Sequence, residues 1–517
     1  MNNKITAQAT TSSRPTNQEA KTQTTSWKGL LGLILLALVI RLYQMAEPSL
    51  WQDEVWSVYL AQQPLAKMFE ILRSQDLQPP LYYLLLKTVI WLGPDNNFLL
   101  RGLATLFDLI ALWPLYLLAR RMAGERAAQI ALLLFSLSSI HVIYSQMVRM
   151  YTLLALLVLT SCYLFWRIME EEKPGWPKLL GYVAATTAML YTQNLSPLYL
   201  VVQGLALLLL FRRKSNIIRA TLIWAICLLL WSPLLLIFLQ QAGGNTFFAK
   251  PDLLFLLDSF VAFGAADRAH NGQPFALLAL IQPYFAVLGL GLLVWLGLGN
   301  LRQRKAERTY LLLFWLVPLL LCWLISQVKS VYADRAFLAS SFPFFILMGA
   351  AFTSFEVRLT VRGFKPPKLR PFWGPLIGGV LTLILSVASI LILASGGYLH
   401  DDLRGLGRDA SLQLTSGGNR NFLLQFNGNS PIIFDHYLLP SAPPNISGFT
   451  SEVEAELNRG PGRVCAITST STVLLEFARE PYQRFQTWLI TRSSRKQNFH
   501  QSYSDESLTL ECWGYIP

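Results

Sequence analysis

The chain has 517 residues, of which 53% are hydrophobic and 14% are charged, whereas soluble domains carry about 25% charged residues. This composition excludes an ordinary soluble protein and indicates a polytopic α-helical membrane protein. The formal net charge of +13 would suit nucleic-acid binding, but the basic residues cluster in short segments between apolar runs. This distribution is typical of the loops of a membrane protein and accounts for the positive charge, so nucleic acid is excluded as a partner.

The chain begins with residues rich in Thr, Gln, Asn and Ser that have no apolar period. Residues 1–28 are therefore predicted to be a disordered cytoplasmic tail. The first apolar run, about Leu30 to Tyr43, has no small-residue cleavage site, so it is predicted to be a retained span and not a removed signal peptide.

Residues 29–396 are predicted to be a transmembrane domain, because a span needs about 20 apolar residues and about eleven segments meet that need. The candidate spans are residues 30–46, 101–119, 127–144, 150–168, 179–195, 197–211, 219–239, 275–299, 309–327, 334–353 and 374–396. With a cytoplasmic N-terminus, Lys and Arg concentrate in the inner loops, as in Arg212-Arg213-Lys214. The positive-inside rule therefore predicts a plasma-membrane protein whose C-terminus lies outside the cytoplasm.

The first outer loop, residues 47–100, contains an apolar segment after Pro79-Pro80 that is too short for a span. It is predicted to form an interfacial helix from Leu81 to about Gly93. The segment from Asp252 to Phe263 is predicted to lie along the outer surface in the same way.

Two adjacent acids, Asp53 and Glu54, stand between Trp51 and Trp56 at the start of this loop. Dehydrating two unpartnered ionised groups is costly, so they are predicted to line a wet cavity that holds a cation, a proton acceptor or a substrate hydroxyl. An ordinary solvated loop with tryptophan anchors is the alternative. Further polar residues favour the functional interpretation: Asp76 in the same loop, and His141, Tyr144, Gln146, Arg149 and Tyr151 in the next outer turn.

Arg149 and Arg335 lie at predicted outer span ends, where a guanidinium can bind a phosphate through paired hydrogen bonds. The alternative for both is a side chain that snorkels to the interface. His141, a lone histidine, is most simply a hydrogen-bonded structural imidazole. Asp108 lies inside a span and is a functional candidate by default, with no partner identifiable in the sequence.

The sequence contains no HxxxH, CxxC or Gly-rich phosphate loop, which excludes zincin-like metalloproteases and P-loop ATPases. Cys162, Cys227 and Cys322 fall within spans and are predicted to be small buried apolar residues.

Residues 397–517 have soluble composition and are predicted to form a small extracytoplasmic α/β domain. Pro431 to Phe434 and Val464 to Thr468 are typical of buried strands, and Ser451-Glu452-Val453-Glu454 has the spacing of a helix start. A disulfide between Cys465 and Cys512 is permitted in this compartment.

An ordered set of motifs resembles a known family. The motifs are Pro48-Ser49-Leu50-Trp51-Gln52-Asp53-Glu54, then Asp76-Leu77-Gln78-Pro79-Pro80-Leu81-Tyr82-Tyr83-Leu84, Leu100-Arg101-Gly102-Leu103, His141-Val142-Ile143-Tyr144-Ser145-Gln146-Met147-Val148-Arg149-Met150-Tyr151 and Asp334-Arg335-Ala336-Phe337-Leu338. Over about residues 30–355 the chain resembles bacterial family-39-type glycosyltransferases of the GT-C superfamily, which are relatives of protein O-mannosyltransferases and of the lipid A aminoarabinose transferase.

The resemblance implies an enzyme that moves a sugar from a polyprenyl-phosphate donor to a lipid, glycan or protein acceptor on the outer face. It implies that Asp53, with Glu54 beside it, is the catalytic base or binds a divalent cation. It also suggests a set of substrate-binding residues: Asp76, Gln78, Tyr82, His141, Arg149, Tyr151 and Arg335.

Two positions depart from the family's usual pattern. Gln78 stands where the family usually has histidine, and Met147 stands where it usually has glutamate. Because the second acid is missing, we expect at most a weak dependence on Mg²⁺ or Mn²⁺.

Two other function classes remain open at the level of the sequence. A transporter or flippase of a lipid-linked or small substrate would need a midplane site between inverted repeats. A non-catalytic membrane scaffold would only present the outer domain to partners.

Overall fold

The structure is a computed structural model that describes two parts of the chain. Residues 27–243 are described apart from positions 75, 77, 94 and 95, and residues 250–361 are described apart from 254–255, 257–258, 261–262, 264–290 and 292–293. Towards the C-terminus, the described segments are 403–415, 421–425, 445–447, 450–459, 462–469, 481–489, 497–503 and 508–515. The predicted span 374–396 and the strand at Pro431 to Phe434 lie outside the described residues, as do most of the span 275–299 and parts of Asp252 to Phe263.

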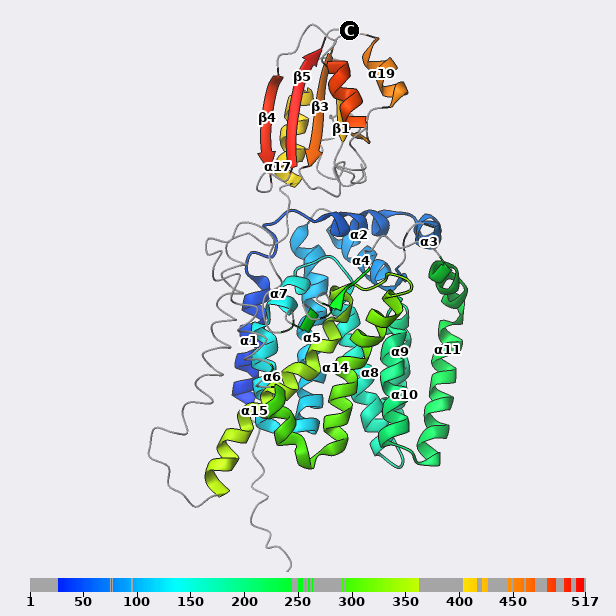
Figure 1. The fold of residues 1–517 in the computed structure, drawn as a ribbon, viewed down its shortest axis with the longest axis vertical. Coiled ribbons are helices and arrows are strands. Elements are labelled where there is room, and N and C mark those ends of the chain that lie inside the picture. The colour runs from blue at the N-terminus through cyan, green and yellow to red at the C-terminus, as the bar shows by residue number, and fades with distance from the viewer. Residues whose placement is uncertain are drawn as a thin grey trace, which may run out of the picture.

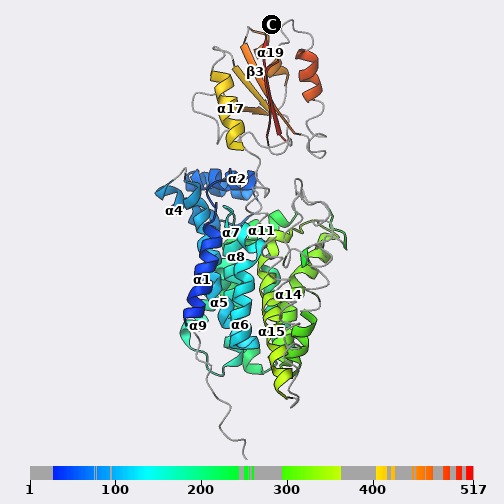
Figure 2. The same cartoon turned by 90° about the vertical axis from the view of Figure 1, so that its left-hand side faces the viewer.

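The first part is a helical bundle (Figures 1 and 2). Its helices are α1 (Trp27–Leu42), α2 (Gln52–Gln62), α3 (Leu65–Ser74), α4 (Leu81–Leu92), α5 (Asn97–Ala123), α6 (Glu125–Leu137), α7 (Ser139–Ser145), α8 (Tyr151–Glu170), α9 (Trp176–Leu190), α10 (Pro197–Leu210), α11 (Lys214–Gly243), α14 (Lys305–Ser326) and α15 (Ser341–Val361), with 3₁₀ turns η1 (Leu301–Gln303) and η2 (Asp334–Ser340).

Five helices of the described part are long and apolar enough to cross a membrane, or six if the bent pair α6 and α7 is one span. This confirms a helical membrane protein, although the expected number of about eleven spans exceeds the number that meets this test. Helix α5 has 27 residues and a length of about 40 Å, so it is longer than the hydrocarbon core of about 30 Å. Helix α5 is therefore long enough to reach both faces of a membrane.

Basic residues gather at one end of the bundle. Arg121, near the end of α5, is paired with Glu170 and with Glu307. Arg304 donates a hydrogen bond to the carbonyl oxygen of Met122 at 3.3 Å. These contacts join the ends of α5 and α8 to the start of α14, where the sequence places inner loops.

Helices α2, α3 and α4 belong to the predicted outer loop, and α2 lies across the opposite end of the bundle (Figures 1 and 2). The short helix α4 is the one predicted from Leu81 to about Gly93, and it ends at Leu92. Helices α2 and α3 were not predicted. Helix α3 exposes Leu65 and Phe69, which suits a helix at an apolar interface.

A buried polar network joins α8, α9 and α10 inside the bundle. Ser161 and Thr186 share a hydrogen bond of 2.8 Å, and the amide of Gln203 donates to Ser161 at 2.9 Å. Pairing inside the bundle is required because no water is available in the hydrocarbon core. The cysteines predicted to be buried, Cys162, Cys227 and Cys322, are buried and free.

The C-terminal part contains a five-stranded sheet with the order β2-β1-β3-β5-β4. The strands are β1 (Asn421–Gln425), β2 (Asn445–Ser447), β3 (Gly462–Ser469), β4 (Gln497–Tyr503) and β5 (Leu508–Tyr515), and the helices are α17 (Leu403–Thr415), α19 (Ser451–Leu457) and residues 481–489. Strand β1 pairs in parallel with β2 and β3, and β5 pairs antiparallel with β3 and β4.

Two sequence expectations are met in this sheet. Cys465 on β3 faces Cys512 on β5, and the two form a disulfide. Helix α19 begins at the predicted Ser451, although the side chain that caps it is Thr450, which accepts a hydrogen bond from the Val453 amide.

Candidate active site

Helix α2 begins directly after Trp51, so Asp53 and Glu54 lie in its first turn. Carboxylates are favoured there because the first amides of a helix have no partner inside it and the helix dipole is positive at that end. Successive residues on a helix point about 100° apart, so the two acids face different surroundings. The Glu54 side chain is fully buried, whereas that of Asp53 is 29% exposed.

Glu54 makes a bidentate ion pair with Arg101 of α5. Arg101 Nε lies 3.0 Å from Glu54 Oε1, and Nη2 lies 3.0 Å from Oε2. The backbone amides of Trp51 and Val148 each donate to the same carboxylate at 2.8 Å. Two donors on each oxygen fill the acceptor sites of this carboxylate.

These contacts do not suit the predicted catalytic role of Glu54. A carboxylate that is buried, paired and saturated with donors is not available to take a proton from an acceptor hydroxyl. It instead joins the start of α2, the start of α5 and the segment before Arg149. Glu54 is therefore a structural partner of Arg101.

Asp53 lies between the two predicted phosphate-binding arginines. Its Oδ2 atom is 3.9 Å from Arg149 Nη2 and 3.8 Å from Arg335 Nη2. These distances bring opposite charges together but exceed hydrogen-bond length. The three residues come from positions far apart in the sequence, and the structure brings their side chains together.

Each arginine also has fixed supports. Arg149 Nη1 donates to Ser57 Oγ at 3.1 Å and to the carbonyl oxygen of Asp53 at 3.3 Å, and its guanidinium lies 5.8 Å from the Tyr151 ring. The guanidinium of Arg335 lies 5.8 Å from the Trp51 ring. Tyr151, a predicted substrate-binding residue, thus supports Arg149 from the start of α8.

Two buried polar atoms have no hydrogen-bond partner among the described residues, namely Arg149 Nε and the Tyr82 hydroxyl. The charge of Arg149 acts on Tyr82. Burial raises the pKa of Tyr82, so its hydroxyl keeps its proton and can donate a hydrogen bond. Unsatisfied buried donors are rare, and a ligand with acceptor oxygens would satisfy both.

Asp76 holds the turn before Pro79-Pro80. Its carboxylate accepts hydrogen bonds from the Trp56 ring nitrogen at 3.0 Å, from the Tyr83 hydroxyl at 2.9 Å and from the backbone amide of Gln78 at 3.1 Å. The predicted substrate-binding role does not suit this carboxylate, because these three donors already bind it. Asp76 anchors α2 to α4.

Gln78 lies in a separate pocket. The walls of this pocket are formed by Phe69, Leu72, Gln78, Pro79, Pro80, Asn194, Leu234, Ile237 and Phe238. Gln78 Oε1 is buried and has no hydrogen-bond partner in the part of the chain that the structure describes. The predicted substrate-binding residue Gln78 therefore lines an apolar pocket that does not include Asp53.

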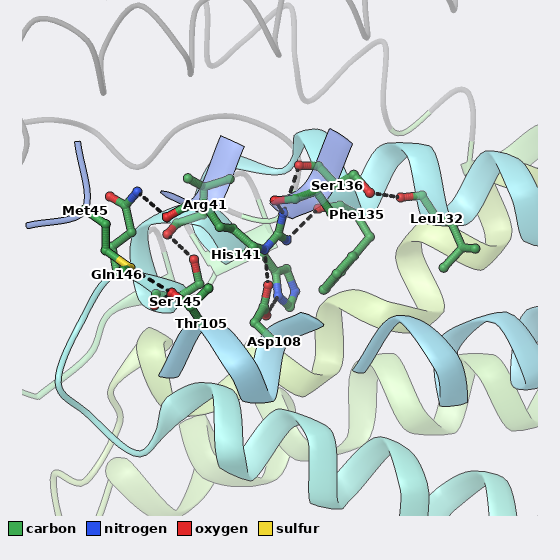
Figure 3. Close-up of polar contacts among 12 residues, drawn as sticks. Arg41, Met45, Thr105, Asp108, Leu132, Phe135, Ser136, His141, Ser145 and Gln146 are labelled. Carbon is green, nitrogen blue, oxygen red and sulfur yellow. Dashed lines mark hydrogen bonds and ion pairs between the residues drawn. The ribbon is translucent and has the colours of Figure 1, made fainter. Parts of the chain in front are cut away.

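His141 lies in a buried cluster instead of the Asp53 site (Figure 3). Its Nδ1 atom is 2.8 Å from Asp108 Oδ1, and its Nε2 atom is 2.8 Å from Ser341 Oγ. Both ring nitrogens are occupied and the side chain is fully buried. These contacts favour the structural interpretation of His141 over the predicted role in substrate binding.

The predicted residues do not fit a divalent cation well. Among the described residues, no group of three His, Cys, Asp or Glu side chains is close enough to hold a metal ion. The charged neighbours of Asp53 are two arginines, and Glu54 and Asp76 are committed to other partners. We assign no metal ligands here and derive no step through a metal.

Sequence reasoning missed Arg41 and Arg101 as partners of the buried acids. Arg41 is the one charged residue in the predicted span 30–46, and Asp108 is the one acid in the span 101–119. A single cation in one span and a single anion in another indicate that the two side chains pair inside the membrane. Ser57, which holds Arg149, follows Asp53 by one helical turn, and no comparable signal marks it.

Comparisons with known proteins agree with this architecture. The family model described as dolichyl-phosphate-mannose-protein mannosyltransferase matches residues 77–237. No curated protein matches the chain. The structure of ArnT from Cupriavidus metallidurans in the apo state is similar with a TM-score of 0.55 at 12% identity, over 93% of this chain and 97% of that chain.

A second similar structure is the archaeal oligosaccharyltransferase AglB from Archaeoglobus fulgidus, in complex with an inhibitory peptide and a dolichol-phosphate. It has a TM-score of 0.51 at 12% identity, over 87% of this chain and 70% of that chain. Together these matches confirm the predicted resemblance at the level of the fold.

Replacing Glu54 tests its structural role. Glu54→Gln leaves the buried Arg101 without its counter-charge, so we expect the free energy of unfolding to fall by about 3–5 kcal/mol. Thermal unfolding of the detergent-purified protein measures this change. The neighbouring Asp53→Asn is the matched control and should unfold near the wild-type temperature, so equal losses in the two variants would contradict the assignment.

Proposed function

Since the chain has the GT-C glycosyltransferase fold, related to the mannosyltransferases and to the lipid A aminoarabinose transferase, we propose that it transfers a sugar from a polyprenyl-phosphate donor to an acceptor on the extracytoplasmic face. The observation that carries the proposal is the position of Asp53 between Arg149 and Arg335. The description of the matching family and the dolichol-phosphate bound to AglB support a lipid phosphate as the donor's carrier.

The charges of this site suit an anionic ligand. One carboxylate faces two guanidinium groups, so the three side chains carry a net charge of +1. The Nη2 atoms of both arginines lie 3.8–3.9 Å from Asp53, so both guanidinium groups present positive charge at the same place, which favours a phosphate. Arg149 Nε and the Tyr82 hydroxyl, which have no hydrogen-bond partner among the described residues, are two candidate donors to it.

In the proposed reaction, Asp53 accepts the proton of the acceptor hydroxyl as its oxygen forms a bond to the anomeric carbon. The bond between that carbon and the phosphate oxygen breaks, and the lipid phosphate leaves with one additional negative charge. Arg149 and Arg335 stabilise that charge where it develops. The partial exposure of Asp53 gives the acceptor a way to reach it.

We also propose the membrane arrangement expected from the sequence, with about eleven spans in residues 29–396, a cytoplasmic tail at residues 1–28 and an extracytoplasmic α/β domain at residues 397–517. In support, α2 and the C-terminal sheet lie at the same end of the bundle in Figure 1. The basic cluster around Arg121 lies at the ends of α5 and α8 and at the start of α14, where the positive-inside rule expects cytoplasmic loops.

Replacing Asp53 tests the base. Asp53→Asn keeps the shape of the side chain but cannot accept the proton, so transfer should fall by about 10²-fold or more. The assay supplies purified protein in lipid nanodiscs with radiolabelled undecaprenyl-phosphate sugars and follows loss of label from the lipid. Wild-type turnover in a folded Asp53→Asn protein would refute the assignment, and no donor consumption by the wild type with any sugar would count against the function itself.

Replacing each arginine by lysine tests the phosphate site. Arg149→Lys and Arg335→Lys keep the charge but lose the paired donors, so we expect donor affinity to fall by about tenfold, the effect of one lost charged hydrogen bond. Titration with undecaprenyl phosphate measures binding without turnover. Lys67→Arg exchanges one cation for another on the exposed surface of α3, and this control should bind undecaprenyl phosphate with wild-type affinity. Unchanged affinity in both lysine variants would contradict the assignment of Arg149 and Arg335 to the phosphate site.

Removing divalent cations tests the metal question. Because Asp53 faces two arginines and the family's second acid is Met147 here, transfer is expected to persist in excess chelator. Met147→Glu should make transfer more responsive to added Mg²⁺ or Mn²⁺. Loss of transfer in chelator, restored by added metal, would show that the unmodified site depends on a cation.

A further inference from the structure

A second charged cluster lies fully buried in the bundle, apart from Asp53. Arg41 of α1 donates from Nε to Asp108 Oδ2 of α5 at 2.6 Å, and His141 of α7 lies 2.8 Å from Asp108 Oδ1 (Figure 3). The side chains of Arg41 and His141 are 0% exposed and that of Asp108 is 1% exposed. Charges in such a place are costly, so the cluster needs an explanation beyond packing.

The cluster holds a bend in the chain. Helices α6 and α7 meet at Ser138 with an angle of 58°, which frees carbonyl groups in the last turn of α6. Arg41 donates to two of them, the carbonyl oxygens of Phe135 at 3.3 Å and of Ser136 at 3.2 Å. Its guanidinium also lies 4.9 Å from the Phe135 ring. A cation at the C-terminal end of a helix is favourable to the helix dipole as well.

The segment that follows the bend is tied to the same elements and leads to Arg149. The side-chain amide nitrogen of Gln146 (Nε2) donates to the backbone carbonyl oxygens of Arg41 at 2.9 Å and of Tyr43 at 3.0 Å. Thr105 of α5 donates to the carbonyl oxygen of Ser145 at 2.8 Å (Figure 3). The backbone from residue 145 to residue 149 is thereby fixed relative to α1 and α5.

The same cluster reaches the segment that carries Arg335. Ser341, the first residue of α15, lies 2.8 Å from His141 Nε2 and donates to the carbonyl oxygen of Leu338 in η2 at 2.7 Å. Arg335 is in that 3₁₀ turn, six residues before Ser341. The His141 side chain is therefore bonded to the segment of Arg335 through Ser341, while the segment of Arg149 follows directly after α7, which carries His141, and is bonded through Gln146 to the backbone of Arg41.

We propose that Arg41, Asp108 and His141 are positioning residues that fix the separation of Arg149 and Arg335, and so shape the phosphate site. The inference rests on the proposed function, because the two arginines matter together only if they bind one anion. A phosphate held by two guanidinium groups needs both at a fixed spacing, and donors fixed in advance bind without paying for reorganisation. The three side chains are 0–1% exposed, so we assign them no direct contact with the substrate.

The test separates positioning from general stability with paired serine variants. Ser341→Ala removes the link from His141 to α15 and keeps the ion pair, while Ser161→Ala removes an equally buried hydroxyl from the α8 to α10 network. We expect Ser341→Ala to weaken undecaprenyl phosphate binding by about threefold to tenfold, the effect of a single hydrogen bond. Ser161→Ala should leave binding at the wild-type value.

Hydrogen exchange gives a readout that does not need the donor. In Asp108→Asn, amide exchange should rise by about tenfold or more in residues 145–149 and 334–341, and remain unchanged in α9 and α10. Where Asp108→Asn fails to fold, Gln146→Ala and Ser341→Ala supply the same comparison for the two segments separately.

Each result decides one of the two proposals. Unchanged exchange in both segments in all folded variants would overturn the positioning role, and so would equal donor binding by Ser341→Ala and Ser161→Ala. If the wild type binds no undecaprenyl phosphate, the proposed function fails, and the exchange measurements still decide whether the cluster positions the two segments.

Discussion

The ion pair between Arg101 and Glu54 is the contact on which the outer end of the molecule depends. A guanidinium buried beside an apolar bundle must have every donor satisfied. Arg101 meets this need with Glu54 and with the carbonyl oxygens of Met45, Pro48 and Ser49, so the chain after α1 has to fold over the start of α5. That path delivers α2 to the bundle and places Asp53 at its surface. The bond from Val148 to Glu54 then brings Arg149 to the same place.

The adjacent carboxylates Asp53 and Glu54 show how one helical turn separates stability from chemistry. Glu54 has a matched cation and a full set of donors, and it is buried. Asp53 faces two cations at distances that no hydrogen bond closes, next to donors that have no partner. The carboxylate of Glu54 has no acceptor site left for a ligand, whereas Asp53 is partly exposed and faces two guanidinium groups. The proposed anion site therefore depends on Asp53 and its two arginines and not on Glu54.

Much of this arrangement is predictable from the sequence because hydropathy, the positive-inside rule and a motif order are local signals. They predicted a helical membrane protein, the short helix after Pro79-Pro80, and Asp53, Arg149 and Arg335 as candidate site residues, whose side chains the structure brings together. They did not predict α2, and without its first turn nothing distinguished the inward Glu54 from the outward Asp53. Nor did they pair Asp108 with Arg41, which is 67 residues away, because contacts between spans depend on how helices pack. The role of His141 likewise depends on its non-local partners Asp108 and Ser341.

The strand order of the C-terminal sheet has a consequence for biosynthesis. Strand β5 is the last strand of the chain, yet it lies between β3 and β4 and is not at an edge. Until the ribosome has finished residues 508–515, β3 keeps an open edge and β4 has no neighbour in this sheet. A chain that ends before residue 508 would therefore lack the strand between β3 and β4, including the buried Leu510 and Cys512. The unpaired edges of β3 and β4 in such a chain would be open to pairing with other chains and so to aggregation.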